Sequence, residues 1–381
     1  MEFYFNAKSV TLLFFFLQGL IFSALLLKKG IELENRSGCL LSAFVLLCVL
    51  SLSPWMFGFA GWYGVDGYRE ALFFIPTQHY FLLGPVIYFY SRFLMNPSFE
   101  LSKADYLHFI PGLLYILYAL VMFVTDVVIL DELYFYADGR DKDLSPIYQF
   151  IGTAYVLGYL LISIRLYFAY KAKIFKEFSF AYAISYNWLK WFLIALSAIL
   201  AARIIFLMIY PSWGDFGAKF WYYVVFSALF YYIALNGLVN TICLSIPYEL
   251  PDLYLYQVAE TPVYAIEDVE GWKARLNELI VEKALYRNPL LSLTDVSDEL
   301  NINRKKVSTI INQGFGMNFN DYINSFRIEE IKKRFENGET EDFTVLGIAL
   351  DSGFNSKTTF NRAFKKYTGS TPQFYIQKLK L

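Results

Sequence analysis

Residues 353–375 read GFNSKTTFNRAFKKYTGSTPQFY, and this stretch decides how the C-terminal part of the chain folds. A glycine suited to a tight turn is followed by a good helix cap, Ser356, and then by apolar residues at helical spacing. The other side of the expected helix carries basic and polar side chains. The stretch follows residues 1–245, which are almost continuously apolar, so the chain has two unlike parts.

The segment before Gly353 completes a helix-turn-helix unit. Thr344 can cap a first helix, Gly353 takes the turn, and Asn355 or Ser356 caps the second helix. The expected inward positions are Ile348, Ala349, Phe360, Ala363 and Phe364. The expected outward positions of the second helix are Lys357, Thr358, Asn361, Arg362 and Lys365.

The same pattern occurs earlier in SLTDVSDELNINRKKVSTIIN, which begins at Ser292. Ser292 and Asp295 can form a capping box, Asn301 tolerates the left-handed conformation at the turn, and Asn303 can cap the second helix. The expected core positions are Val296, Leu300, Val307, Ile310 and Ile311. The expected polar and basic face holds Arg304, Lys305, Lys306, Ser308, Thr309 and Asn312.

Both second helices suit the major groove of double-stranded DNA. Amides and hydroxyls can reach base edges there, while lysines and arginines neutralise phosphates. Between the units, residues 318–336 predict one helix whose apolar face changes sides part-way. Such a helix would join two bundles rigidly, and a separation of about 34 Å would let both units enter successive major grooves.

These residues resemble the AraC/XylS-type transcription regulators over residues 291–375. The family pattern IAxxxGFxSxxxFxRxFKKxxGxTPxxY stands here as Ile348, Ala349, Gly353, Phe354, Ser356, Phe360, Arg362, Phe364, Lys365, Lys366, Gly369, Thr371, Pro372 and Tyr375. The resemblance implies that base contacts come from Lys305, Ser308, Thr309, Thr358 and Arg362. This chain departs from the pattern at Asn301, Ile331 and Ile376, which replace a glycine, a small residue and an arginine.

The N-terminal part predicts seven membrane-spanning helices, since about 20 apolar residues cross a bilayer. The stretches are 9–27, 38–60, 71–95, 107–130, 147–170, 188–210 and 219–245. They are apolar all round rather than alternating, which favours helices over a transmembrane barrel. The expected fold is therefore all-α, a seven-helix bundle followed by a domain with two helix-turn-helix subdomains.

Lysine and arginine gather in one set of loops, which predicts the orientation. The loops after the first, third and fifth stretches carry Lys28, Lys29, Arg36, Arg92, Lys103, Lys171, Lys173 and Lys176. The opposite loops carry fewer, namely Arg69, Arg140, Lys142 and Lys219. The expected location is a bacterial inner membrane with the N-terminus outside and the C-terminal domain in the cytoplasm.

Three domains are expected from these patterns: a transmembrane sensor at 1–245, a linker and connector helix at 246–287, and a DNA-binding domain at 288–381. The connector has an apolar stripe of Val269, Trp272, Leu276, Leu279 and Ile280. That stripe either packs on its own domain or pairs with a second copy, giving a homodimer.

A few polar residues fall inside the expected spans, where ionisable groups are costly and often functional. Gln78, His79 and Arg203 are candidates for a ligand site, and Arg165 either snorkels or joins them. No cofactor, metal site or disulfide framework is indicated, because Cys39, Cys48 and Cys243 have no paired spacing and no neighbouring histidine.

The leading hypothesis is a membrane-bound regulator in which the bundle detects a small molecule, lipid or protein and the tethered domain binds promoter DNA. The alternative is an integral membrane enzyme or transporter of lipids or small solutes that carries a regulatory DNA-binding domain. The spans hold no HExxH or GxSxG motif and no evident inverted repeat of broken helices, so a non-enzymatic sensor is preferred.

Overall fold

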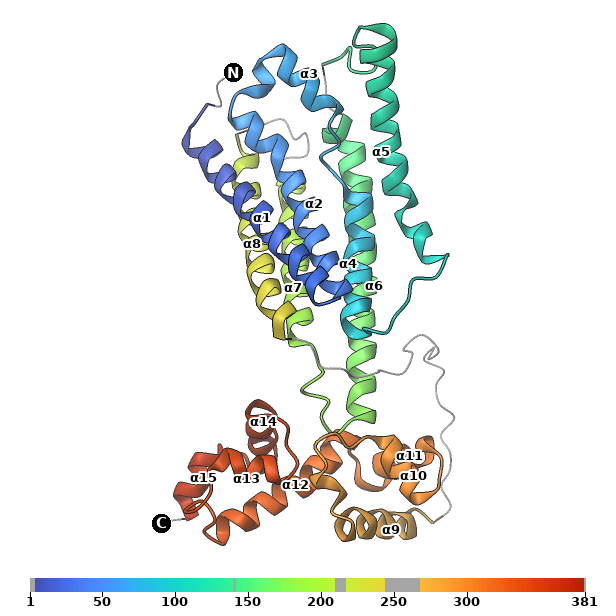
Figure 1. The fold of residues 1–381 in the computed structure, drawn as a ribbon, viewed down its shortest axis with the longest axis vertical. Helices are drawn as coiled ribbons and strands as arrows, with labels where there is room; N and C mark the ends of the chain where they lie inside the picture. Colours follow the sequence, from blue (N-terminus) through green and yellow to red (C-terminus); the bar gives the residue numbers. More distant parts are fainter. Residues whose placement is uncertain (1–3, 140–141, 210–216, 244–267, 380–381) are drawn as a thin grey trace. The chain divides into compact units, whose positions relative to one another are not determined.

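The computed structural model describes residues 4–139, 142–209, 217–243 and 268–379, and these residues form helices without a β-strand (Figure 1). The chain divides into two compact units. The N-terminal unit comprises Met1–Tyr167 and Asn187–Leu255, and the C-terminal unit comprises Phe168–Tyr186 and Tyr256–Leu381. The segment Phe168–Tyr186 therefore groups with residues far away in the sequence, which nothing in the sequence had indicated.

The helices that begin in the N-terminal unit are α1 Ala7–Glu32, α2 Arg36–Phe59, α3 Asp66–Phe74, α4 Tyr80–Met95, α5 Ile110–Phe123, α6 Pro146–Glu177, α7 Asn187–Ile209 and α8 Lys219–Cys243. A 3₁₀ turn precedes α5 and a π-helical turn, Val124–Leu130, extends it. α2 packs against α1, α4 and α8 and forms the middle of this unit.

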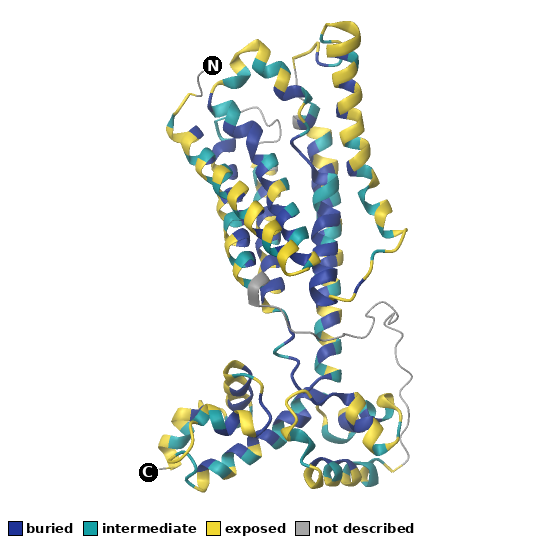
Figure 2. Ribbon diagram, viewed as in Figure 1, coloured by how far each residue is buried: buried dark blue, intermediate teal, exposed yellow. Residues whose placement is uncertain are grey.

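Six helices within the described residues are long and apolar enough to cross a membrane: Ala7–Glu32, Arg36–Phe59, Asp105–Leu130, Pro146–Glu177, Asn187–Phe206 and Lys219–Asn240. These correspond to six of the seven predicted stretches. Large apolar side chains remain exposed along α1 and α5, as the yellow positions in Figure 2 show. On α5 these include Leu113, Leu117 and Leu120.

The third predicted stretch, 71–95, is two helices and not one. α3 ends at Phe74, and α4 begins at Tyr80 and has 16 residues. Ile75 is extended, with φ −82° and ψ 111°, because the residue before a proline avoids the helical conformation and Pro76 has no amide hydrogen to donate. The prediction of one continuous helix was wrong here, and Gln78 and His79 lie in the break.

The C-terminal unit is built around one long helix, α12. Its helices are α9 Val269–Glu282, α10 Leu293–Leu300, α11 Arg304–Phe315, α12 Phe319–Glu336, α13 Val345–Asp351, α14 Lys357–Thr368 and α15 Pro372–Leu379. In Figure 1, α9, α10 and α11 gather at one end of α12 and α13, α14 and α15 at the other.

Each end of α12 belongs to its own apolar core, as its change of apolar face predicts. Phe319, Tyr322 and Ile323 join the first cluster with α9, α10 and α11. Ile328, Ile331 and Phe335 join the second cluster with α13 and α14. Since both cores share α12, the two helix-turn-helix subdomains are held by one continuous helix.

The apolar stripe of the connector helix α9 packs on its own domain. Leu276 and Ile280 are fully buried in the first cluster, and Trp272 and Leu279 pack against it. Of the two predicted partners for this stripe, the structure has the intramolecular one. The predicted juxtamembrane linker before α9 lies outside the described residues.

Candidate nucleic-acid interface

The first helix-turn-helix has the local geometry that its sequence predicts. The Ser292 hydroxyl accepts the amide hydrogen of Asp295, and the Asp295 carboxylate accepts that of Ser292 at 2.7 Å, which completes the capping box. Asn301 is left-handed at the turn, with φ 50°. The side chain of Asn303 accepts the amide hydrogen of Lys305 at 2.8 Å and starts α11.

The outward face of α11 carries most of the predicted DNA-contacting residues. Arg304, Lys305 and Asn312 are exposed, while Ser308 and Thr309 are half-buried. The Asn312 amide donates to the Ser308 hydroxyl at 3.3 Å, so two of the polar groups lie side by side. Val307, Ile310 and Ile311 are buried on the opposite face, as predicted.

Lys306 points away from the rest of this set. Its ammonium lies 4.0 Å from the centre of the Trp272 ring, and the side chain is half-buried. A cation over an indole ring is attracted by the negative face of the ring. The structure therefore uses Lys306 to hold the connector helix α9, although the sequence pattern grouped it with the DNA-facing residues.

The second helix-turn-helix also has the predicted geometry. Thr344 caps α13, and Gly353 takes the turn with φ +96°. The hydroxyl of Ser356 accepts the amide hydrogen of Thr359, so Ser356 and not Asn355 caps α14. The predicted outward residues are all exposed, namely Lys357, Thr358, Asn361, Arg362 and Lys365.

Arg362 has a neighbour from the segment Phe168–Tyr186. Its guanidinium carbon lies 4.4 Å from the centre of the Tyr182 ring. Planar guanidinium groups stack favourably on aromatic faces. One of the two arginines predicted to face DNA is thus in contact with a tyrosine of its own chain.

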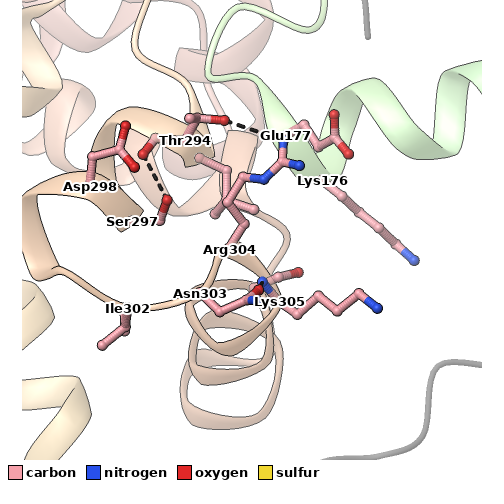
Figure 3. Close-up of a pocket in the computed structure, with 11 residues that line it drawn as sticks. Lys176, Glu177, Thr294, Ser297, Asp298, Ile302, Asn303, Arg304 and Lys305 are labelled. Atoms are coloured by element: carbon pink, nitrogen blue, oxygen red, sulfur yellow. Dashed lines mark hydrogen bonds between the residues drawn. The ribbon is translucent and has the colours of Figure 1, made fainter. Parts of the chain in front are cut away.

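A pocket between α10 and α11 of the first helix-turn-helix is also lined by the end of α6. Its lining includes Lys176 and Glu177, from the end of α6, together with Arg304 and Lys305 (Figure 3). The Arg304 guanidinium also reaches the hydroxyl of Thr294 at 3.5 Å. The start of α11 is therefore a basic surface that faces both a lysine and a carboxylate of the same unit.

The centre of α12 holds a buried arginine that sequence reasoning missed. Arg327 is 1% exposed, and its guanidinium donates to the carbonyls of Tyr286 and Asn288, each at 2.7 Å. It also donates to the side chain of Asn324 and to Ser179. Burial lowers the pKa of Arg327 to about 9, so the group stays charged at neutral pH. The signal in the sequence was the helical spacing of Asn320, Asn324 and Arg327, which places three polar residues on one face of α12.

Two of the three polar residues predicted inside the spans belong to one buried network. The guanidinium of Arg203 donates to Thr153 at 2.7 Å and to Gln149. The Tyr80 hydroxyl lies 2.9 Å from the side-chain oxygen of Gln149 and 2.8 Å from that of Gln78, and these two acceptors share its one hydrogen. Gln78 and Arg203 are therefore linked through two intermediate side chains.

His79 lies next to this network without a hydrogen bond to it among the described residues. It is 7% exposed and packs edge-to-face on Tyr115, with ring centroids 5.8 Å apart. Arg165, in contrast, is exposed on α6.

Residues 296–378 match the family described as helix-turn-helix domain. An uncharacterized HTH-type transcriptional regulator of Staphylococcus aureus (strain COL) is 30% identical over 101 residues, which are 26% of this chain and 13% of that protein. The melibiose operon regulatory protein of Escherichia coli (strain K12) is 29% identical over 85 residues, which are 22% of this chain and 27% of that protein.

No solved structure gives a significant match. The chain thus spans only 13% and 27% of the length of these two relatives. The expected resemblance is confirmed over residues 296–378, which are a helix-turn-helix domain of the AraC type.

Proposed function

We propose that the chain is a membrane-bound, sequence-specific DNA-binding regulator of transcription, in which a signal received by the N-terminal helices alters promoter binding. One observation carries the proposal. Two capped helix-turn-helix units, each with an exposed basic and polar second helix, occur in a chain whose described part has six helices long and apolar enough to span a bilayer. The exposed apolar side chains of α5 suit lipid contact.

In the proposed topology, α4 is the remaining span, which makes seven. Its 16 residues are about 24 Å long, short of a hydrocarbon core of about 30 Å. The non-helical residues before it would complete the crossing, which is tolerated only where such backbone is buried in protein. Thr77, Gln78 and His79 are all buried, and the Thr77 amide donates to Asp143 at 3.2 Å.

An odd number of spans and the lysine and arginine bias of the loops favour a cytoplasmic C-terminus, where DNA is accessible. The proposed location is the inner membrane of a bacterium, with the N-terminus outside. A homodimer would have to use a surface other than the stripe of α9, since Leu276 and Ile280 are buried in its own domain.

The DNA contacts are proposed at the exposed residues of α11 and α14. The resemblance implies base contacts for five residues: Lys305, Ser308, Thr309, Thr358 and Arg362. Arg304, Lys357 and Lys365 suit phosphates. The network around Arg203 of α7 is the proposed place where a signal acts, because it buries a charge among neutral groups. Gln149 and Thr153 of α6 and Tyr222 of α8 accept its hydrogen bonds, and the Tyr80 ring of α4 lies against it.

Genome-wide mapping of the DNA bound in cells tests this function. We expect the full chain to occupy a small set of promoters and the Arg362→Ala variant to lose them. A matched control is Arg334→Ala, since Arg334 of α12 pairs with Glu339, just after that helix, and has no proposed DNA contact. Absence of discrete binding sites, or equal loss with the control, would contradict the proposal.

The topology needs its own measurement. A reporter fused after residue 381 should be active in the cytoplasm and inactive outside. A C-terminus outside the cell would make contact with the chromosome impossible.

A further inference from the structure

A short segment between α6 and α7 occupies a built site on the DNA-binding domain. Phe178, Ser179, Phe180 and Ala181 are buried in the C-terminal unit, and Ser179 and Ala181 are 0% exposed. The Ser179 amide donates to the Leu291 carbonyl at 3.1 Å. Phe178 forms an antiparallel bridge with the residue that caps α10. The segment thus pairs with the start of the first helix-turn-helix.

Two polar side chains of α12 donate hydrogen bonds to this segment, and a third connects them. The Asn320 amide donates to the carbonyls of Phe178 and Ser179, at 3.2 and 2.7 Å. Arg327 donates to the Ser179 hydroxyl at 3.0 Å and to its carbonyl at 3.4 Å. Asn324 connects the two, since it donates to Asn320 and accepts from Arg327.

These donors are costly to bury without acceptors. Asn320, Asn324 and Arg327 are at most 1% exposed, and a buried guanidinium needs hydrogen-bond partners for each of its edges. Ser179 supplies two of the acceptors of Arg327. The three side chains therefore form a binding site for a short peptide, and the occupant is the segment itself.

Both ends of the segment reach the helices proposed to bind DNA. Glu177 lines the pocket at the start of α11 with Arg304 and Lys305, as Figure 3 shows. At the other end, Tyr182 stacks on Arg362 of α14. A carboxylate at the start of α11 repels the phosphates that this basic surface would bind, and an arginine held on a tyrosine is less available for a base.

We propose that residues 177–182 are an autoinhibitory segment, which docks on α12 and must leave both recognition helices before DNA binds tightly. The inference rests on the proposed function and assigns its regulation. α6 runs without interruption from Pro146 to Glu177, and it carries Gln149 and Thr153, the partners of Arg203. A signal that shifts α6 moves residues 177–182 as well, because they follow this helix without a break in the chain.

The test uses the full chain in lipid nanodiscs and a labelled duplex from the region upstream of its own gene. Tyr182→Ala removes the stacking on Arg362, and we expect affinity to rise about two- to fivefold. Ser179→Leu removes the hydroxyl and overfills the site, and we expect a rise of about tenfold. The control is Tyr134→Ala, a tyrosine 66% exposed in the N-terminal unit, which should leave the affinity unchanged.

Hydrogen exchange of the unmodified chain gives a second readout that needs no variant. Amides of residues 178–182 should exchange faster when the duplex is bound. Equal affinities of the unmodified chain and both variants, or exchange that is unchanged or slower on DNA, overturn the inference alone. Failure of every form of the chain to bind DNA overturns the proposed function and the inference with it.

Discussion

Replacing Gly353 by alanine should destabilise the DNA-binding domain far more than replacing Gly369. Both glycines follow a helix of the second helix-turn-helix and are left-handed, with φ +96° and +74°. They differ in their surroundings. A Cβ at Gly353 would lie 2.3 Å from the Tyr286 carbonyl oxygen and 2.9 Å from the Arg287 backbone, whereas one at Gly369 meets nothing within 4 Å.

The expected magnitude has two parts. An alanine in a left-handed conformation costs about 1–2 kcal/mol, and this applies to both positions. Only at Gly353 must backbone also shift to make room, and overpacking of this kind costs about 1–3 kcal/mol more. Alanine also restricts the unfolded chain, but equally in both variants, so the difference between them isolates the clash.

The assay is urea unfolding of residues 266–381, followed by far-ultraviolet circular dichroism. We expect Gly353→Ala to unfold at a midpoint about 1 M lower than Gly369→Ala. Midpoints that agree within error would refute the argument, because they would mean that the turn does not approach the backbone at Tyr286. The same contact places the second helix-turn-helix against Tyr286, whose carbonyl accepts a hydrogen bond from Arg327.

Three further measurements test individual contacts. Ser292→Ala loses the capping box of α10 and should lower the free energy of unfolding of the domain by about 1 kcal/mol in urea, whereas no change would mean that water replaces the cap. Lys305→Ala should reduce the salt dependence of DNA binding by about one ion. Lys306→Ala should leave the salt dependence unchanged and lower the stability of the domain by about 0.5–1 kcal/mol, because it loses the contact with Trp272. The reverse result would contradict the roles given to these two lysines. Arg203→Met leaves the buried hydrogen-bond partners of Arg203 unsatisfied, and thermal unfolding of the full chain in nanodiscs should show a loss of stability of about 2–3 kcal/mol. The control is Arg165→Met, on an exposed arginine, and an equal loss there would contradict this explanation.

Local structure in the C-terminal unit was predictable because its causes lie within a few residues. The capping box of Ser292, the left-handed Asn301 and the turn at Gly353 each follow from side-chain chemistry within one helical turn. The two apolar faces of α12 also follow from spacing alone. A resemblance to a known family added the roles of the outward residues, which remain proposals.

The break before α4 is an intermediate case. The sequence contains its cause, since Pro76 disfavours a helix at Ile75, but the apolar content of residues 71–95 outweighed that signal. Mean hydropathy depends only on which residues are apolar and takes no account of the amide hydrogen that Pro76 lacks. The polar residues that follow are buried, which apolar content also does not predict.

By itself, the sequence determined the helices of the C-terminal unit, their caps and the two helix-turn-helix units, because these depend on interactions between residues three or four positions apart. Only the tertiary structure decided which distant groups meet. Arg327 donates a hydrogen bond to Ser179 across a separation of 148 residues. Lys306 packs over the Trp272 ring, and Arg203 donates to Gln149. No periodic pattern encodes such pairs, since a buried polar group takes whatever partner the packing of the whole chain brings within reach.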